Sequence, residues 1–295
     1  MEQDNTFKLK KYNKNIQFDM TLASDHIMKQ IIANNDFYEP ELLSWLASIN
    51  LWEGDVIDIG ASFGNHTLFF SHVLEKRVMC FEVNPISYKI LKKNIKYNQL
   101  ENQVSAYNIA LADSSYKVNL KTEDSNNIGA TAIELDQEGT YDTRCLDEFT
   151  ESFSRKISII KIDVEGLELS VLRGGLNTID QYRPLLLIEC MTENHLRQVS
   201  LYLKDYSYQP VAIFCDTPVI VFCPKIRLNE IFYDQTPNFH SEYRVYQSQK
   251  KLESKINKTY RMLDQVRTNL GRISETKESR QEKEQEIERL NQELE

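Results

Sequence analysis

The chain has 295 residues, of which 41% are hydrophobic and 27% are charged, and its formal net charge is −9 at pH 7. This length and composition predict a folded protein of one or two domains, and the acidic balance argues against general electrostatic binding to nucleic acid or anionic membranes. The N-terminus has no apolar leader, no segment approaches the ~20 apolar residues of a membrane span, and the five cysteines include no CxxC pair. We therefore expect a cytoplasmic protein without a membrane span.

Residues 1–36 are polar and weakly patterned, and we interpret them as an N-terminal extension with one helix around 26–33. A helical pattern begins after Tyr38, and Pro40 occupies a position where a first-turn proline is tolerated. The apolar face of this predicted helix consists of Leu42, Leu43, Leu46 and Ile49.

A strand, a glycine-bearing turn and a helix follow. The β-branched run Val56–Ile59 contains Asp58, and we expect a helix over Asn65–Leu74. This arrangement brings backbone amides close to a bound nucleotide-like group. A second strand, Val78–Glu82, ends in an acidic side chain 24 positions after Asp58, a suitable distance for accepting hydrogen bonds from two ribose hydroxyls. Together the two segments predict a nucleoside-cofactor site.

The next segments alternate helices with strands. The expected elements are a helix at 86–97, a strand at 104–109, an extra strand near 118–123, a loop at 126–129, a strand at 157–163, a helix at 166–173 and a strand at 184–189. The strands at 157–163 and 184–189 are continuous apolar runs, which is typical of strands buried on both faces. The alternation predicts an α/β fold with a doubly wound, mostly parallel sheet.

The last strands of the predicted sheet differ from those of the purely parallel dinucleotide-binding fold. The apolar runs 211–215 and 219–223 are joined by only three residues, so they must pair antiparallel. The turn after Gly60 also has Ser62 and Asn65 where the GxGxxG fingerprint requires glycine. Both observations argue against an NAD site.

Residues 249–295 form a highly polar segment with a heptad pattern. Its apolar a/d positions are Ile256, Leu263, Val266, Leu270, Ile273, Ile287 and Leu294, and the polar ones are Thr259, Lys277, Arg280, Glu284 and Asn291. We expect a coiled coil, best defined up to Ile273, that makes a homo-oligomer or binds a coiled-coil partner. The alternative is a solvated single helix stabilised by i,i+4 ion pairs.

Several segments resemble the FkbM family of S-adenosylmethionine-dependent methyltransferases. They are DIGASFGNHT and FEVNP, most specifically KIDVEGLELSVLRGG (161–175), and also FYEPELL (37–43) and TRCLDEF (143–149). The resemblance covers about residues 37–224. It implies a Rossmann-like class I methyltransferase fold over residues 37–248, S-adenosyl-L-methionine as cofactor, and O-methylation, often of sugar or polyketide hydroxyls.

The resemblance and the strand-end positions together predict a cofactor site. Glu82 would bind the ribose, and Gly60 and Gly64 would let the backbone approach the methionine part without a Cβ in the way. The predicted cofactor-binding residues are Glu39, Asp58, Gly60, Ala61, Gly64, Asn65, Glu82, Asn84, Ala110 and Leu111. Other roles stay open: Asp58 could brace the turn, Glu82 could be a solvated carboxylate, Glu39 could stabilise a helix dipole, and Ala110 and Leu111 could be core residues.

Three carboxylates at strand ends are the predicted catalytic residues, because ligands of open α/β sheets lie beyond the carboxyl ends of the strands. They are Asp163, Glu165 and Glu189. We expect them to orient an acceptor hydroxyl or remove its proton. The alternatives are ligation of Mg²⁺, capping of the helix at 166–173, and proton removal by His66 or His195 instead.

The favoured interpretation is an O-methyltransferase whose partner is a hydroxylated small-molecule or glycan acceptor, most simply a sugar hydroxyl. The alternative is a methyltransferase-like interaction module that assembles partners through residues 249–295. A methyltransferase of nucleic acid or protein is a weaker third interpretation, because the chain lacks an NPPY-like motif and its globular part is acidic.

Overall fold

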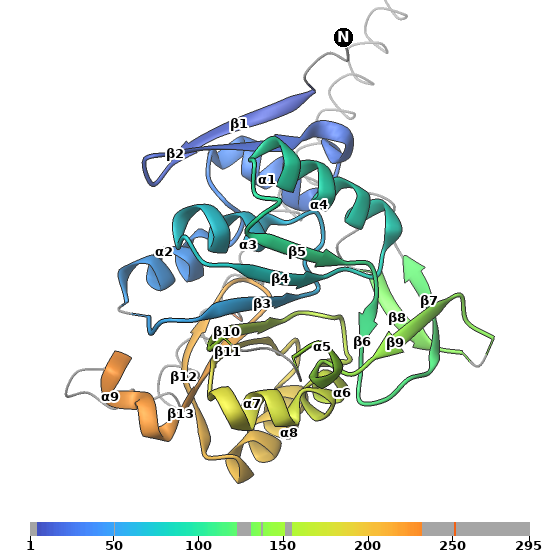
Figure 1. Ribbon diagram of the computed structural model, residues 1–295, viewed down its shortest axis with the longest axis vertical. Coiled ribbons are helices and arrows are strands. Elements are labelled where there is room, and N and C mark those ends of the chain that lie inside the picture. Colours follow the sequence, from blue (N-terminus) through green and yellow to red (C-terminus); the bar gives the residue numbers. More distant parts are fainter. Residues whose placement is uncertain are drawn as a thin grey trace, which may run out of the picture. The chain divides into compact units, whose positions relative to one another are not determined.

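The computed structural model describes residues 5–231, apart from 50, 123–130, 137 and 151–154, together with residue 251 (Figure 1). Residues 5–231 belong to one compact unit, Met1–Phe239, and His240–Glu295 form a second. Apart from Lys251, the predicted coiled coil lies outside the described residues, and so does the predicted loop at 126–129. None of the described helices is long and apolar enough to cross a membrane. No disulfide joins the five cysteines.

A central sheet has the strand order β12-β13-β11-β10-β3-β4-β5 among the described residues (Figure 1). Its strands are β3 (Asp55–Ile59), β4 (Val78–Phe81), β5 (Val104–Tyr107), β10 (Ile157–Ile162), β11 (Leu185–Glu189), β12 (Tyr208–Phe214) and β13 (Val219–Pro224). The strands from β11 to β5 pair in parallel, whereas β13 runs antiparallel to both β11 and β12. The predicted antiparallel ending of a mostly parallel, Rossmann-like sheet is confirmed.

Helices alternate with these strands along the chain. They are α1 (His26–Asn34), α2 (Pro40–Ser48), α3 (Asn65–Leu68), α4 (Pro85–Tyr97), α6 (Glu168–Gly174), α7 (Leu176–Tyr182) and α8 (Glu193–Asp205). Alternate strand residues such as Val56, Cys80 and Leu187 share one buried core with α1, α2 and α4. This alternation follows from the period of two along a strand. The parallel strands thus bring their carboxyl ends, and the turns after them, to one edge of the sheet.

The helix predicted over Asn65–Leu74 differs from the structure in its hydrogen bonding. The α-helical part ends at Leu68 and continues as a π-helix, η2 (Phe69–Val73), where Leu74 N donates to Phe69 O over five residues at 3.2 Å. The wider turn accommodates Phe69 and Phe70, which are fully buried. The strand predicted to reach Ile109 ends at Tyr107, because Asn108 turns its side-chain amide to the Glu82 carbonyl.

The N-terminal residues contain a hairpin that the sequence pattern does not predict. Strands β1 (Thr6–Lys11) and β2 (Lys14–Asp19) pair antiparallel, and η1 (Met20–Leu22) follows. Leu9, Ile16 and Phe18 on the hairpin are at most 1% exposed and belong to the same buried core as the central sheet. The predicted helix near 26–33 is confirmed as α1.

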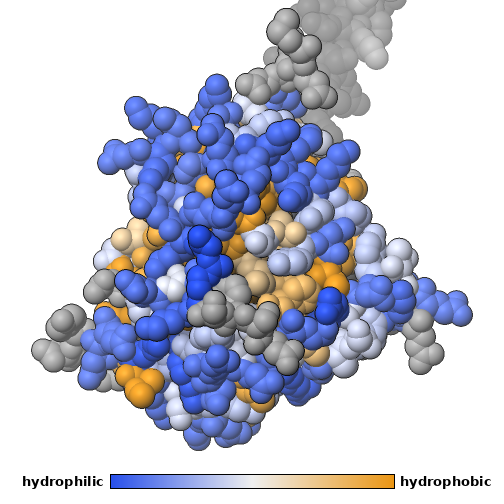
Figure 2. All heavy atoms as spheres, in the orientation of Figure 1, coloured by the Kyte–Doolittle hydropathy of each residue, from blue (hydrophilic) through white to orange (hydrophobic). Residues whose placement is uncertain are grey.

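A small second sheet has the strand order β6-β9-β7-β8. Its strands are β6 (Ala110–Leu111), β7 (Lys117–Thr122), β8 (Thr131–Leu135) and β9 (Tyr141–Arg144), and α5 (Asp147–Thr150) follows; η3 (Lys225–Arg227) and α9 (Leu228–Ile231) end the described chain, Lys251 aside. The extra strand predicted near 118–123 is confirmed as β7. Figure 2 shows a mostly hydrophilic surface on the visible face, with apolar residues gathered near its middle.

Candidate active site

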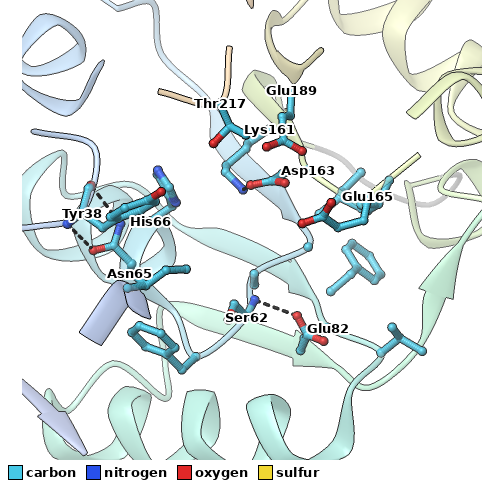
Figure 3. A pocket seen from close by; sticks show the side chains of 18 of the residues that line it. Tyr38, Ser62, Asn65, His66, Glu82, Lys161, Asp163, Glu165, Glu189 and Thr217 are labelled. Atoms are coloured by element: carbon cyan, nitrogen blue, oxygen red, sulfur yellow. Dashed lines mark hydrogen bonds and ion pairs between the residues drawn. The ribbon is translucent and has the colours of Figure 1, made fainter. Parts of the chain in front are cut away.

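A cavity of about 280 Å³ lies at the carboxyl ends of β3, β4, β10 and β11 (Figure 3). The predicted residues that line it are Glu39, Gly60, Ala61, Asn65, Glu82, Ala110, Leu111, Asp163, Glu165 and Glu189. Asp58, Gly64 and Asn84 are not among its lining residues. The fold therefore brings together most of the residues that the sequence singled out, although they come from segments up to 150 positions apart, Glu39 to Glu189.

Glu82 follows β4 and is held by two main-chain amides. Its Oε2 accepts a hydrogen bond from Ser62 N and its Oε1 accepts one from Asn84 N, both at 2.7 Å. The side chain of Asn84 accepts from Ile86 N and caps α4. Burial raises the pKa of Glu82 to about 7. Each carboxylate oxygen still has a lone pair available, so the group is fixed in place and can accept further hydrogen bonds.

An apolar recess lies beside Glu82. Phe81 and Val83 are the sequence neighbours of Glu82 and line the recess. Ile109, Ala110 and Leu111 line the same part of the cavity. Ala110 and Leu111 are at most 3% exposed. A carboxylate next to an apolar recess suits a ligand with adjacent hydroxyls and a flat apolar ring.

The two loop glycines have packing roles that the sequence does not reveal. Gly60 has a φ of +80°, and a Cβ there would lie 1.7 Å from the carbonyl oxygen of Asp163. Gly64 has a φ of +99°, and its Cβ would lie 2.7 Å from Cδ1 of Leu91 on α4. The missing side chains let the turn after β3 pack against the end of β10 and against α4.

Asp58 lies beneath the turn and is fully buried. Its Oδ2 accepts a hydrogen bond from Thr67 Oγ1 at 2.6 Å, and its Oδ1 lies 3.8 Å from Lys161 Nζ. The first contact joins the end of β3 to α3, as expected of the bracing role that the sequence left open. Asp58 also contributes negative charge beneath the cavity.

The three predicted catalytic carboxylates form one group, which we call the carboxylate cluster (Asp163, Glu165 and Glu189). One oxygen of each lies within 4.8 Å of the others. Figure 3 shows the cluster on one side of the cavity, with Tyr38, Asn65 and His66 on the other. Parallel neighbours β10 and β11 bring Asp163 and Glu189 together, and a turn with φ of +54° at Glu165 brings the third carboxylate in.

The charges within the cluster are unequal. Burial alone would raise the pKa of Asp163, but the Lys161 ammonium, 3.0 Å from its Oδ2, holds that pKa below its ordinary value. Burial raises the pKa of Glu189 to about 10, and the charge of Asp163 acts in the same direction. Burial raises the pKa of Glu165 to about 7, again reinforced by Asp163. At neutral pH, Asp163 is ionised, Glu189 is protonated, and Glu165 is near its midpoint.

Lys161 is a residue that the sequence-based list of site residues omits. It is 2% exposed, lines the cavity and contacts Asp163 and Asp58. Burial would lower the pKa of Lys161, but these two carboxylates raise it above its ordinary value. The available signal was a lysine inside the apolar run ISIIKID, because a buried lysine requires a charged partner.

The opposite side of the cavity is built from the segment before α2. The Asn65 side chain bonds both Tyr38 N (3.0 Å) and Tyr38 O (3.2 Å), which fixes that segment against α3 (Figure 3). Glu39 has a φ of +60°, lines the cavity and lies 2.9 Å from His66 Nε2. Tyr38, Ser62 and Thr217 also line the cavity and were not predicted.

The alternatives to the catalytic prediction were a histidine base, capping of the helix at 166–173 and ligation of Mg²⁺, and the structure bears on each differently. His66 reaches the cavity, whereas His195 is not among the lining residues and lies 3.3 Å from Glu168. Neither Asp163 nor Glu165 caps α6; Glu168 Oε1 instead accepts from Val164 N and Gly166 N. Close carboxylates would suit Mg²⁺, but the Lys161 ammonium already contacts Asp163, so magnesium binding stays a prediction without support.

Comparisons with known proteins agree with the sequence motifs. The family model described as methyltransferase FkbM domain matches residues 58–210. The hexuronic acid methyltransferase AglP of Haloferax volcanii is 30% identical over 129 residues, which are 43% of this chain and 52% of the relative. This chain thus spans about half the length of that relative.

Two solved structures are similar at lower identity. The FkbM methyltransferase of Methylobacillus flagellatus KT is 18% identical, with a TM-score of 0.45 over 69% of this chain and 57% of that one. The precorrin-6y C5,15-methyltransferase of Geobacter metallireducens GS-15 is 14% identical, with a TM-score of 0.40 over 63% and 86%. Because the family model covers more than half of the sequence, this chain belongs to the FkbM methyltransferase family.

Proposed function

We propose that this chain is an S-adenosylmethionine-dependent O-methyltransferase that methylates a hydroxyl of a sugar or glycan. Family membership supports methyl transfer, and the name of the archaeal relative, a hexuronic acid methyltransferase, supports a sugar acceptor. The observation that carries the proposal is the position of Glu82 and the carboxylate cluster in one cavity.

The residues present fit the cofactor. Glu82 would accept hydrogen bonds from the ribose hydroxyls, and the recess of Phe81, Ala110 and Leu111 would take the adenine. Tyr38 and Asn65 would lie towards the methionine end. The cavity lining has five carboxyl side chains and one lysine among the described residues, which suits a cofactor that carries a positive sulfonium.

The protein's own tasks are binding, orientation and proton removal. When bound, S-adenosylmethionine would supply an electrophilic methyl group on sulfur, which an acceptor oxygen attacks while the neutral thioether leaves. Glu165 has a pKa near the operating pH, so it accepts the proton that leaves the acceptor hydroxyl. Ionised Asp163, held by Lys161 and by the protonated carboxyl of Glu189, accepts a hydrogen bond from the acceptor.

Labelled methyl transfer tests this assignment. Purified protein, labelled S-adenosylmethionine and a panel of glycosides should yield labelled methyl ethers. Glu165→Gln should bind the cofactor normally and lower kcat by about 100-fold or more, a typical effect of removing a general base. Glu193→Gln, at an exposed position on α8, is the matched control. Full turnover by Glu165→Gln would exclude Glu165 as the base, and absence of transfer to every acceptor would contradict the proposed activity.

The interaction-module alternative depends on residues 249–295, of which the structure describes Lys251 alone. No observation on residues 5–231 favours it.

A further inference from the structure

The carboxylate cluster includes one buried oxygen to which no donor of the described residues points. Glu189 is 7% exposed, lines the cavity, and its Oε2 has no hydrogen-bond partner among the described residues. Figure 3 shows its carboxyl group next to Asp163, on the cavity side of β11. A buried polar atom without a partner is costly, so an incoming polar group that bonds it would recover that cost.

The lysine next to the cluster is already paired with carboxylates of the protein. Lys161 is the one lysine or arginine that lines the cavity in the described part of the chain. It lies between Asp163 (3.0 Å) and Asp58 (3.8 Å) and is almost completely buried. Its charge is therefore shared by two carboxylates of the protein itself, and Lys161 has no charge left to pair with an acceptor carboxylate beside the cluster.

The two histidines of the cavity each have a polar neighbour of their own. His66 Nε2 lies 2.9 Å from Glu39 Oε2, on the side of the cavity opposite the cluster (Figure 3). His26, at the start of α1, has its Nε2 2.8 Å from the side-chain nitrogen of Gln30. The internal segments outside the described residues, 123–130 and 151–154, contain no lysine, arginine or histidine in their sequence. They cannot supply a cation to the acceptor.

The carboxylate cluster would repel an anionic group on the acceptor. Like charges a few ångströms apart in a partly buried site repel strongly, because the effective dielectric constant is far below that of water. Placing such charges together is also a common means of rejecting unsuitable partners. Hydroxyl groups have no such penalty, because they can donate hydrogen bonds to Asp163 and to Glu189 Oε2.

We propose that the acceptor is a sugar ring that carries no anionic group next to the reacting hydroxyl, and that the carboxylate cluster rejects uronic acids. This inference rests on the proposed function and narrows its substrate class. An amino sugar fits at least as well as a neutral one, since its ammonium pairs with the cluster.

The test compares binding of sugars that differ in one substituent. Methyl glycosides of a hexose, the matching 2-amino hexose and the matching hexuronic acid, in the gluco, galacto and manno series, are titrated by NMR into protein saturated with S-adenosylhomocysteine. In at least one series we expect the neutral and amino sugars to bind and the uronate to bind at least tenfold more weakly. Uronate affinity equal to or above that of the neutral sugar overturns the inference.

A charge-removing variant identifies the origin of the selectivity. Glu165→Gln should raise uronate affinity relative to the neutral sugar by at least threefold, whereas the exposed control Glu193→Gln should leave the ratio unchanged. An unchanged ratio in Glu165→Gln overturns the assignment to the cluster. Protein that binds S-adenosylhomocysteine but no sugar in any series overturns this inference alone. Folded protein that does not bind S-adenosylhomocysteine overturns the proposed function instead.

Discussion

The ammonium of Lys161 lies 3.0 Å from Oδ2 of Asp163, and both groups belong to the end of β10. The two side chains are two positions apart, so they project to the same side of the strand edge. This buried pair keeps Asp163 ionised, and the negative charge of Asp163 in turn favours the protonated form of Glu189. One ion pair thus sets the protonation states of the side of the cavity where we place the acceptor.

Removing the Lys161 charge should destabilise the fold. Lys161→Met would leave Asp58 and Asp163 buried without their cation, and breaking a buried pair in this way costs about 3–5 kcal/mol. Chemical denaturation measures the free energy of unfolding. Lys156→Met, five positions earlier at an exposed position just before β10, should change it by less than about 0.5 kcal/mol. Equal stability of the two variants would contradict the role of Lys161.

Glu82→Gln should weaken cofactor binding while the protein stays folded. A hydrogen bond to a charged group is worth about 1.5–3 kcal/mol, so loss of the ribose contacts should raise the Kd by roughly 10- to 100-fold or more. Calorimetric titration with S-adenosylhomocysteine gives the Kd, and circular dichroism checks the fold. Glu101→Gln, at an exposed position, is the matched control. Undiminished affinity in Glu82→Gln would remove the ribose assignment.

The pKa of Glu82 predicts a pH dependence of stability. Burial raises this pKa from 4.5 to about 7 in the folded protein, so the folded state holds a proton that the unfolded state has lost. The contribution of Glu82 to the free energy of unfolding therefore falls as the pH rises from about 4.5 to about 7, and is constant above that range. We expect the stability of the wild type relative to Glu82→Gln to decrease between pH 5 and pH 8. A difference that is flat or rises with pH would be inconsistent with a raised pKa.

Gly60→Ala should displace the end of β10. The added Cβ would lie 1.7 Å from the Asp163 carbonyl oxygen, and the φ of +80° adds strain. Gly166→Ala is an informative control, because Gly166 also has a positive φ (+110°) but no atom lies within 4 Å of its Cβ position. Cofactor affinity should fall at least tenfold in Gly60→Ala and less than threefold in Gly166→Ala. Similar affinities would mean that backbone strain, and not the clash, limits both positions.

Much of the fold follows from local patterns in the sequence. The apolar runs at 157–163 and 184–189 are buried strands, and the three-residue connection before Val219 leaves no choice but antiparallel pairing. The β1–β2 hairpin is harder to predict, because only Leu9, Ile16 and Phe18 carry its buried face among many polar residues. The π-helical turn after Leu68 depends on how Phe69 and Phe70 pack, which local periodicity does not encode.

In the site, too, some features follow from local sequence patterns and others depend on residues far apart in the chain. Strand-end positions predict Glu82, Asp163 and Glu189, because parallel strands carry their carboxyl ends to one edge. Their protonation states depend on neighbours far apart in the chain, so the sequence alone could not separate the base from the hydrogen-bond donor. In the sequence, Lys161 stands out only as a charged residue within an apolar run. The pairing of β10 with β3 places it next to its partner Asp58.

We propose above that the cavity at the carboxyl ends of the parallel strands binds S-adenosylmethionine. Isothermal titration calorimetry of the purified wild-type chain with S-adenosylmethionine, and separately with S-adenosylhomocysteine, tests it most directly. We expect saturable binding of one molecule per chain for both compounds. Folded protein that gives no binding heat with either compound, over a range of temperatures, would contradict it.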